Sequence, residues 1–275
     1  MKCIAWNIHE NPNGLAALRQ HLVHDPSVAF VMATEWPPAC ITPVAFASAF
    51  GSDFDLVSCL RNTGKGTYRA LVARRNAYSN ENIYDFQRLT LVDLLLNNGK
   101  QMGLGVYHGV SRLDEDNDGN RLSAAKDIAV EARRWVADRE NIPTIIGGDF
   151  NAEPWSQEIA GEAWYAGWEP ERLAIHYFGK ASRTPVLTFF NPMWRVILQS
   201  GVQAAGTFHY EANRKEVRAR YFFDGFLTTP DLREGVNCMV LDHLLPDVNL
   251  LVPGLNVPDI NLSDHLPVQI EVSLP

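Results

Sequence analysis

The stretch PTIIGGDFN, residues 143–151, is a short apolar run that ends in two glycines, an acid and an amide. A second stretch, SDHLPVQIEV, residues 263–272, places an acid and an imidazole directly before an alternating apolar segment. In both stretches the polar side chains stand where a strand begins or ends, on a stiff backbone that still faces a cleft. Catalytic groups must be held within a fraction of an ångström, and this placement suits them. The two stretches together indicate a site for phosphoester chemistry.

Outward from residues 143–151, strands and helices interleave, with strands in the majority. The patterns predict helices over residues 15–24, 121–138 and 157–166. In residues 121–138 the apolar positions recur at the spacing of one helix face. Strands are predicted over residues 2–7, 28–35, 54–60, 68–75, 83–95, 103–108, 145–149, 218–228, 238–244 and 267–274, with a helix-like end at 92–96.

Strands often follow one another without a crossover helix, which disfavours a doubly wound Rossmann sheet. The order favours an α/β fold, a four-layer sandwich of two packed mixed sheets flanked by helices. The 275 residues, 46% of them hydrophobic, can bury a full core. With no linker-like stretch or fixed-period repeat, the chain is predicted to form one domain over residues 1–275.

The N-terminal residues do not have the pattern of a secretory signal. No apolar run approaches the roughly 20 residues that span a bilayer, so no transmembrane segment is predicted. The four cysteines are scattered, without CxxC spacing, and fit buried thiols in a reducing compartment. A cytoplasmic protein is therefore expected.

The formal net charge of the chain is -8. This balance argues against tight non-specific binding to duplex nucleic acid, which needs a basic surface. It leaves nucleic acid open as a substrate, because a locally basic cleft or a bound divalent cation can reverse the field at a phosphate. No protein partner is indicated.

Polar residues gather at the ends of the predicted strands. Their burial is costly unless they pair with one another or hold a metal. They are Asn7, Glu35, His108, Asp149, Asn151, Asp224, Asp264 and His265.

Short motifs surround these residues in a characteristic order. They are IAWN (4–7), TE (34–35), VYH (106–108), GDFN (148–151), FDGF (223–226) and SDHLP (263–267). This set resembles the endonuclease/exonuclease/phosphatase superfamily, which includes deoxyribonuclease I-like nucleases, abasic-site endonucleases, sphingomyelinases and inositol-polyphosphate phosphatases. GDFN alone would be weak, but the ordered set spans almost the whole chain and makes coincidence improbable.

The resemblance implies a divalent cation, Mg²⁺ or Mn²⁺. Glu35 is the expected primary ligand, helped by Asp264, with Asn7 as a further candidate. Such hard oxygen donors suit a hard cation that keeps several waters and shares a substrate phosphate.

The resemblance also implies the catalytic roles. Asp149 is expected to orient or deprotonate the attacking water, and Asn151 to donate its amide to a phosphoryl oxygen. His265 would contact the scissile phosphate, with Asp224 hydrogen-bonded behind it, and His108 would be a second imidazole. The implied reaction is in-line attack of water on phosphorus.

Three of these residues also have simpler interpretations. Asn7 is compatible with an ordinary turn residue. Glu35, directly before Trp36, is compatible with a solvated acid at a strand end. A lone histidine such as His108 is more often structural than catalytic, and only its place in the ordered set favours catalysis.

The chain departs from two branches of this superfamily. In the deoxyribonuclease-like branch an acid from an earlier strand pairs with the first histidine, but residues 62–75 contain no Asp or Glu. His108 must therefore be oriented by another group. The abasic-site branch carries a YVPN-like segment, which Tyr107-His108-Gly109-Val110 does not match.

Weaker signals suggest substrate contacts. Arg61, Arg69 and Arg74 flank a GKGT sequence at residues 64–67 and are predicted to form a basic loop over the cleft, with a solvated hairpin as the alternative. Trp194 could stack on a nucleobase or anchor a buried loop.

The acidic run from Asp114 to Gly119 has the alternating acids of a Ca²⁺ loop. The twelfth position is Ala125 instead of Glu, which excludes an EF-hand. A looser Ca²⁺ site or a solvated loop that caps the next helix are the remaining interpretations.

The leading prediction is a Mg²⁺-dependent phosphodiesterase that acts as a nuclease on DNA or RNA. The alternative keeps the chemistry but places it on a phospholipid headgroup, an inositol phosphate or a small nucleotide. A catalytically inactive binding module is disfavoured, because every core position of the motif set is filled.

Overall fold

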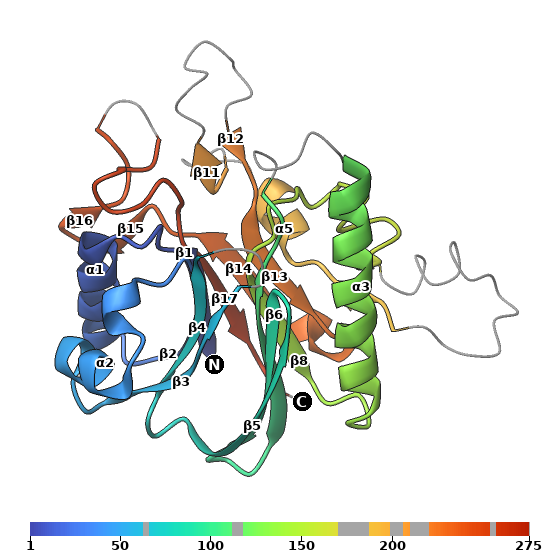
Figure 1. The fold of residues 1–275 in the computed structure, drawn as a ribbon, viewed down its shortest axis with the longest axis horizontal. Coiled ribbons are helices and arrows are strands. Elements are labelled where there is room, and N and C mark those ends of the chain that lie inside the picture. The colour runs from blue at the N-terminus through green and yellow to red at the C-terminus, as the bar shows by residue number, and fades with distance from the viewer. Residues whose placement is uncertain are drawn as a thin grey trace, which may run out of the picture.

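The protein forms two β-sheets packed face to face, with helices on both outer faces (Figure 1). This arrangement confirms the predicted α/β sandwich. The structure, a computed structural model, describes residues 1–62, 66–111, 118–169, 187–198, 206–209, 220–253 and 257–274. Among the described residues, no helix combines the length and the hydropathy that a membrane crossing needs.

The first sheet has six strands in the order β14-β17-β1-β2-β4-β3. Their bounds are Val236–Val240, Val268–Val272, Lys2–Asn7, Val28–Thr34, Tyr68–Arg74 and Phe54–Arg61. Strands β1 and β2 run parallel, and Asn7 lies opposite Thr34. Strand β17 is antiparallel to β1, with Val268 opposite Ala5. The end of β1, the end of β2 and the start of β17 therefore lie at one edge.

The second sheet has seven strands in the order β5-β6-β7-β8-β13-β10-β9. Their bounds are Tyr78–Phe86, Leu89–Leu96, Gln101–His108, Thr144–Asp149, Asp224–Thr228, Phe189–Phe190 and Ala166–Gly167. Parallel pairing of β7 with β8 sets His108 opposite Asp149. Antiparallel pairing of β8 with β13 sets Asp224 opposite the same residue. Three polar residues thus lie in one row at one edge of this sheet.

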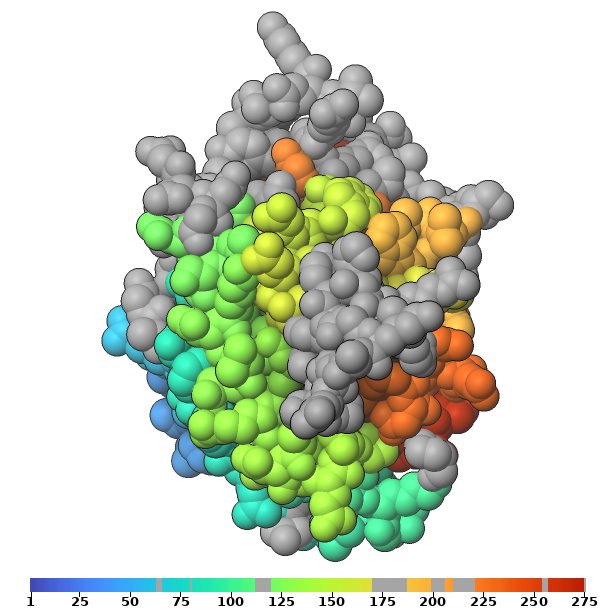
Figure 2. Space-filling model, turned by 90° about the vertical axis from the view of Figure 1, so that its right-hand side faces the viewer, coloured from blue at the N-terminus to red at the C-terminus, as the bar shows by residue number. Residues whose placement is uncertain are grey.

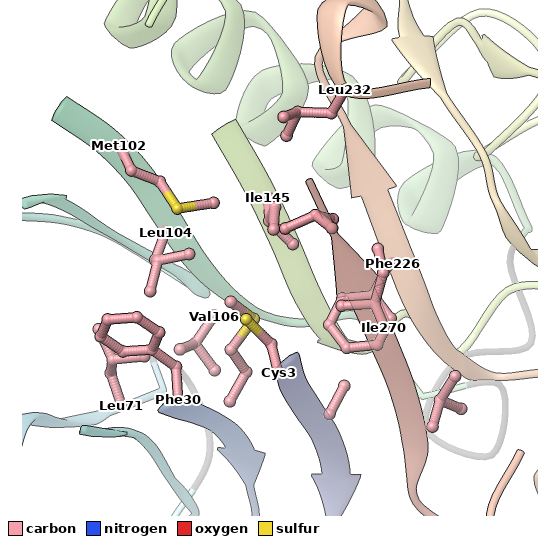
Figure 3. Packing of buried hydrophobic residues seen from close by; sticks show 14 of the residues in the cluster. Cys3, Phe30, Leu71, Met102, Leu104, Val106, Ile145, Phe226, Leu232 and Ile270 are labelled. Carbon is pink, nitrogen blue, oxygen red and sulfur yellow. The ribbon is translucent and has the colours of Figure 1, made fainter. Parts of the chain in front are cut away.

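The main core lies between the two sheets. Alternate apolar side chains of both sheets point toward one another, among them Cys3, Phe30, Leu104, Ile145 and Phe226 (Figure 3). Each large side chain fully buried in this way stabilises the fold by about 1.5–3 kcal/mol.

Helices close the two outer faces. Helix α1 (Pro12–His24) and helix α2 (Pro43–Phe50) pack on the first sheet through a second apolar cluster. Helix α3 (Asp118–Ala137) packs on the second sheet through a third, and its green residues lie on the left of the face shown in Figure 2. The Asn11 side chain caps α1 by accepting hydrogen bonds from two backbone N–H groups of its first turn.

Short elements complete the fold. They are helix α5 (Met193–Leu198), the pair β11 (Phe208–His209) and β12 (Arg220–Tyr221), the pair β15 (His243–Leu245) and β16 (Val248–Asn249), and the 3₁₀ turns Pro38–Cys40 and Pro230–Gly235. Strands β11 and β12 stand above the edge where β1 ends (Figure 1).

Several element predictions were wrong in detail. Residues 83–95, predicted as one strand, belong to the hairpin β5–β6, which turns at Gln87 with a positive φ of 52°. Residues 157–166 form turns instead of a helix, and Ala166 then pairs with Phe189 in the sheet. The described residues 220–228 of the segment 218–228 form two strands, residues 238–244 also divide between two strands, and α2 was not predicted.

Candidate active site at the joined edges of the two sheets

The structure brings all eight strand-end residues to the shared edge of the two sheets. The first sheet supplies Asn7 and the residues next to β2 and β17, and the second sheet supplies the row with Asp149 between His108 and Asp224. Contacts between the sheets join these groups. The Asn7 side-chain amide donates to Asp149 Oδ2 at 2.9 Å, and its backbone N–H donates to Asp224 Oδ1 at 3.3 Å.

His265 and Asp224 form a buried pair at the centre of this edge. Asp224 Oδ2 lies 2.6 Å from His265 Nδ1. Burial lowers the pKa of His265, but the Asp224 carboxylate outweighs burial and raises that pKa to about 10. The imidazole is therefore protonated at neutral pH.

The backbone around His265 is fixed as well. Its N–H donates to Ser263 Oγ at 3.1 Å, and the Ser263 hydroxyl donates to the Asn7 carbonyl at 2.7 Å. The Trp6 indole donates to the His265 carbonyl at 2.9 Å. The Phe208 ring packs on the imidazole with centroids 4.6 Å apart. These contacts hold the ring in one orientation.

Asp149 is held by amide donors on both carboxylate oxygens. Oδ1 accepts from the Asn151 backbone N–H at 2.8 Å, and Oδ2 accepts from the Asn151 side chain at 3.1 Å as well as from Asn7. Burial raises the pKa of Asp149 to about 7, against the opposing charge of His265. A carboxylate with this pKa is suited to take a proton near neutral pH.

Asn151 lies against Asp149 and contacts acceptors within the protein. Its side-chain amide faces Asp149 Oδ2 and also lies 3.4 Å from the Gly109 carbonyl. Its φ is 50°, and the Arg121 guanidinium donates to its carbonyl at 3.1 Å. In this structure Asn151 holds the Asp149 carboxylate in place.

His108 is oriented by an amide, at the place where an acid was expected by analogy with the deoxyribonuclease-like branch. Asn62 Nδ2 lies 2.9 Å from His108 Nδ1, and Asn62 Oδ1 accepts from Arg69 Nη1 at 2.7 Å. Because arginine can only donate, it fixes which end of the amide faces His108. The Nδ1 atom must then accept, and the ring proton lies on Nε2. That atom is 3.7 Å from Glu35 Oε1 and 3.9 Å from Asp149 Oδ2.

Glu35 and Asp264 both approach His9, a residue that the sequence analysis missed. His9 Nδ1 is 3.2 Å from Glu35 Oε2 and 3.5 Å from Asp264 Oδ1. The hydrogen bond to Glu35 raises the pKa of His9. Burial raises the pKa of Glu35, but its hydrogen bond with His9 and the nearby positive charge of His265 outweigh burial and lower that pKa. Glu35 is therefore an ionised ligand candidate at neutral pH.

These two acids fit a hard divalent cation. Asp264 Oδ1 is buried and, within the part of the chain that the structure describes, has no hydrogen-bond partner. An orphaned carboxylate oxygen beside an ionised Glu35 is the donor set that Mg²⁺ or Mn²⁺ takes.

Asn7 is a poorer candidate for a cation ligand than Glu35 and Asp264, because its side-chain amide has other partners. Its Oδ1 accepts from the His9 backbone N–H at 2.9 Å, and its Nδ2 donates to Asp149. Asp149, Asp224 and His265 also present ligand atoms within 4.8 Å of one another. His265 Nδ1 and Asp224 Oδ2 are already hydrogen-bonded to each other, and Asp149 Oδ2 accepts from Asn151, so Glu35 and Asp264 are the better cation ligands.

Two of the predicted arginine contacts are corrected by the structure. Arg69 has a fully buried side chain, and its guanidinium donates to Thr90, Asp85 and Asn62. Arg74 donates to the Leu22 carbonyl at 2.6 Å, behind the first sheet. Neither side chain is available to substrate, since each satisfies buried acceptors.

The other predicted contacts are placed as follows. Arg61 is exposed, next to Asn62. Trp194 on α5 is partly exposed, and its ring lies 6.3 Å from that of Trp155, which is 48% exposed. In Figure 2 the yellow-green residues that follow β8 lie beside the golden α5. Residues 64 and 65 of the GKGT sequence and 114–117 of the acidic run lie outside the described residues.

Comparison with known proteins agrees with this geometry. The model of the Endonuclease/Exonuclease/phosphatase family matches residues 4–265. A search of curated protein sequences gives no match.

Solved structures share the fold at low identity. Truncated TDP2 of Caenorhabditis elegans superposes with a TM-score of 0.62 at 12% identity, over 99% of this chain and 97% of that chain. A mannosyl-6-phosphatase of Bacteroides thetaiotaomicron gives 0.65 at 14%, over 100% of both chains. The human Nocturnin catalytic domain gives 0.59 at 14%, over 99% and 94%. At these identities the likeness shows the fold alone.

Proposed function

The chain belongs to the Endonuclease/Exonuclease/phosphatase family of phosphoester hydrolases, and we propose that it is a Mg²⁺-dependent phosphodiesterase that cleaves DNA or RNA. One observation carries the chemistry. A carboxylate with a pKa of about 7, Asp149, and a protonated imidazole, His265, lie in one buried cluster beside two converging acids. This cluster supplies an acceptor for the proton of water and a positive charge for phosphate.

Each residue then has a role that its contacts support. Asp149, held by Asn7 and Asn151, accepts the proton of the attacking water. The His265 imidazolium, fixed by Asp224, stabilises the charge that develops on the phosphoryl oxygens. Because these groups are oriented before substrate binds, little reorganisation is needed during the reaction.

His108 supplies a further donor through Nε2–H. Glu35 and Asp264 would hold the Mg²⁺ ion, or Mn²⁺ in its place. When bound, the ion polarises a phosphoryl oxygen and adds positive charge to the site. The cation-binding and proton-accepting groups are thus supplied by different residues.

Two exposed groups support a nucleic acid as substrate. Trp155 follows Asn151 by four positions, and with Trp194 it forms a partly exposed indole pair. Aromatic stacking of this kind is worth about 1–3 kcal/mol for each base and tolerates any sequence. Arg61, next to Asn62, supplies a cation for the phosphate backbone.

A second candidate is a phosphatase or phosphodiesterase that acts on a phospholipid headgroup, an inositol phosphate or a small nucleotide. The guanidinium groups of Arg69 and Arg74 donate hydrogen bonds within the protein, and the net charge of the chain is -8. The two arginines therefore add little attraction for the phosphate backbone of a long nucleic acid. One of the solved structures with the same fold is a mannosyl-6-phosphatase of Bacteroides thetaiotaomicron. A small substrate needs only the cluster around His265.

A substrate panel tests the proposal. Single-stranded DNA, duplex DNA, RNA, bis-p-nitrophenyl phosphate and inositol phosphates are each incubated with Mg²⁺ and with EDTA. We expect hydrolysis of a nucleic acid with Mg²⁺ alone, and a decrease of at least about 100-fold in Asp149→Asn and His265→Ala.

His24→Ala, which removes an exposed imidazole from α1, is the matched control and should keep full activity. Equal rates in all variants contradict the mechanism. Turnover of inositol phosphates without cleavage of any nucleic acid contradicts the nuclease and supports the second candidate.

A further inference from the structure

His9 occupies the space between the two acids that fit a cation. It follows β1 in a turn, and its own φ of 54° and that of Glu10, also 54°, lie in the left-handed region. Such backbone is costly for residues other than glycine and is retained where the surroundings fix it. Here it carries the imidazole back toward Glu35 and Asp264, although 56% of the side chain stays exposed.

The spacing of the three side chains fits ligands of one ion. Neighbouring ligands of an octahedral ion with bonds of about 2.1 Å lie about 3 Å apart. His9 Nδ1 is 3.2 Å from Glu35 Oε2 and 3.5 Å from Asp264 Oδ1. The second of these oxygens is buried, and no described group donates a hydrogen bond to it. One ion could therefore contact all three atoms after small side-chain movements.

The amide of Asn7 does not compete for this place. Its oxygen accepts the backbone N–H of His9, and its nitrogen donates to Asp149. The hydrogen bond to His9 also fixes the turn from which the imidazole extends. Both ends of the Asn7 amide are thus engaged within the protein, and Asn7 fixes the turn that carries His9.

We propose that His9 Nδ1 is a direct ligand of the divalent cation, together with Glu35 and Asp264, and that it selects Mn²⁺ over Mg²⁺. The inference rests on the proposed function, because it concerns the same metal site. Mg²⁺ prefers oxygen ligands and demands near-ideal octahedral geometry, whereas Mn²⁺, although it also favours oxygen, accepts an imidazole nitrogen more readily than Mg²⁺ does. A site of two carboxylates and one imidazole therefore has a higher ratio of Mn²⁺ to Mg²⁺ affinity than an all-oxygen site has.

Electron paramagnetic resonance of Mn²⁺ bound to the full chain tests this directly. Electron spin echo modulation detects an imidazole ¹⁴N that is bonded to Mn²⁺. We expect that modulation in the wild type and in the exposed-histidine control His24→Ala, and its loss in His9→Ala. Titration should show Mn²⁺ affinity lower by at least about tenfold in His9→Ala.

His9→Asp gives the complementary result, because it replaces the nitrogen by an oxygen ligand. We expect its ratio of Mn²⁺ to Mg²⁺ affinity to fall relative to the wild type, with a thermal melt in EDTA that confirms folding. Mn²⁺ bound to the wild type without ¹⁴N modulation would overturn the inference. Modulation that persists in His9→Ala would also overturn it, since His108 or His265 would then be its source.

These outcomes are separate from the proposed function. The substrate panel measures metal-dependent hydrolysis by the wild type, and its result does not depend on whether ¹⁴N modulation is seen. Absence of any Mn²⁺ binding by the wild type overturns both the ligand assignment and the metal dependence.

Discussion

Asn62 controls the hydrogen bonding of His108 although it does not itself face the site. The buried Arg69 guanidinium donates to its oxygen, so the amide nitrogen must point at the ring. An acid at this position would accept a proton from the ring nitrogen, whereas the amide donates one. The choice between an amide nitrogen and a carboxylate oxygen at position 62 therefore decides whether the His108 ring proton lies on Nδ1 or on Nε2, the nitrogen that faces the site.

Asn62→Asp should reverse that tautomer. The new carboxylate accepts a hydrogen bond from Nδ1 and draws the ring proton to that atom. We expect the ¹⁵N chemical shifts of His108 to exchange between Nδ1 and Nε2, and kcat to fall at least about tenfold because the donor into the site is lost.

Thr67→Val is the matched control for this experiment. It removes the other partner of the Asn62 amide nitrogen, which lies 2.9 Å away, but keeps the contact to His108. The ring shifts of Thr67→Val should equal those of the wild type. A His108 spectrum in Asn62→Asp that is unchanged from wild type would contradict the assignment.

At the scale of elements, strand β8 brings Asp149 into the site through two glycines. A Cβ at Gly147 would lie 2.6 Å from Met32 Sδ and 2.7 Å from a Phe226 ring carbon, in the packed space between the sheets. Gly148 has a φ of 141°, and a Cβ there would lie 2.1 Å from the Tyr107 carbonyl oxygen. Glycine at these two positions lets β8 pack closely against Met32, Phe226 and the backbone of Tyr107.

Gly148→Ala is expected to be strongly destabilising. The added methyl group meets backbone atoms of β7, which move only if the sheet is distorted, and the positive φ adds about 1 kcal/mol. We expect urea denaturation to show a loss of more than about 3 kcal/mol of unfolding free energy.

Gly99→Ala is the matched comparison, because its φ of 82° is also positive but its Cβ would meet nothing within 4 Å. This variant should lose only about 1 kcal/mol. Equal losses at the two positions would show that backbone conformation alone, and not the contact with β7, sets the cost.

At the scale of the whole molecule, a buried cation joins the two sheets beside the site. Arg69 lies on β4 of the first sheet, and its guanidinium donates to Asp85 and Thr90 and to the Gln87 carbonyl of the β5–β6 hairpin. The same group holds Asn62. The relative position of the sheets and the orientation of His108 therefore depend on one side chain.

Arg69→Met should destabilise the fold by at least about 3 kcal/mol in urea denaturation, because it leaves several buried acceptors without donors. Asp85→Asn is expected to cost less than about 1 kcal/mol. The Asp85 side chain is 44% exposed, so water replaces part of its interaction. A cost for Asp85→Asn as large as that for Arg69→Met would show that the ion pair, not the wider set of acceptors, is what joins the sheets.

Much of this architecture follows from local patterns in the chain. The apolar runs that form β1, β2 and β8 are short and bounded by polar residues, so their ends are visible in the sequence. Asn7, Glu35 and Asp149 could be predicted as site residues because each stands next to such a run. The helix-like spacing of residues 121–138 likewise identified α3, since one face of a helix must be apolar to pack on a sheet.

Sequence by itself therefore determined most of the long strands, the layering and the polar residues at the strand ends, because these depend on neighbours in the chain. Tertiary structure alone decided their partners. His9 lies in a left-handed turn outside any strand, Arg69 sits in an apolar strand facing a distant acid, and Asn62 meets His108 across 46 positions. Such contacts depend on strand register and on the packing of one sheet against the other, which no local pattern encodes.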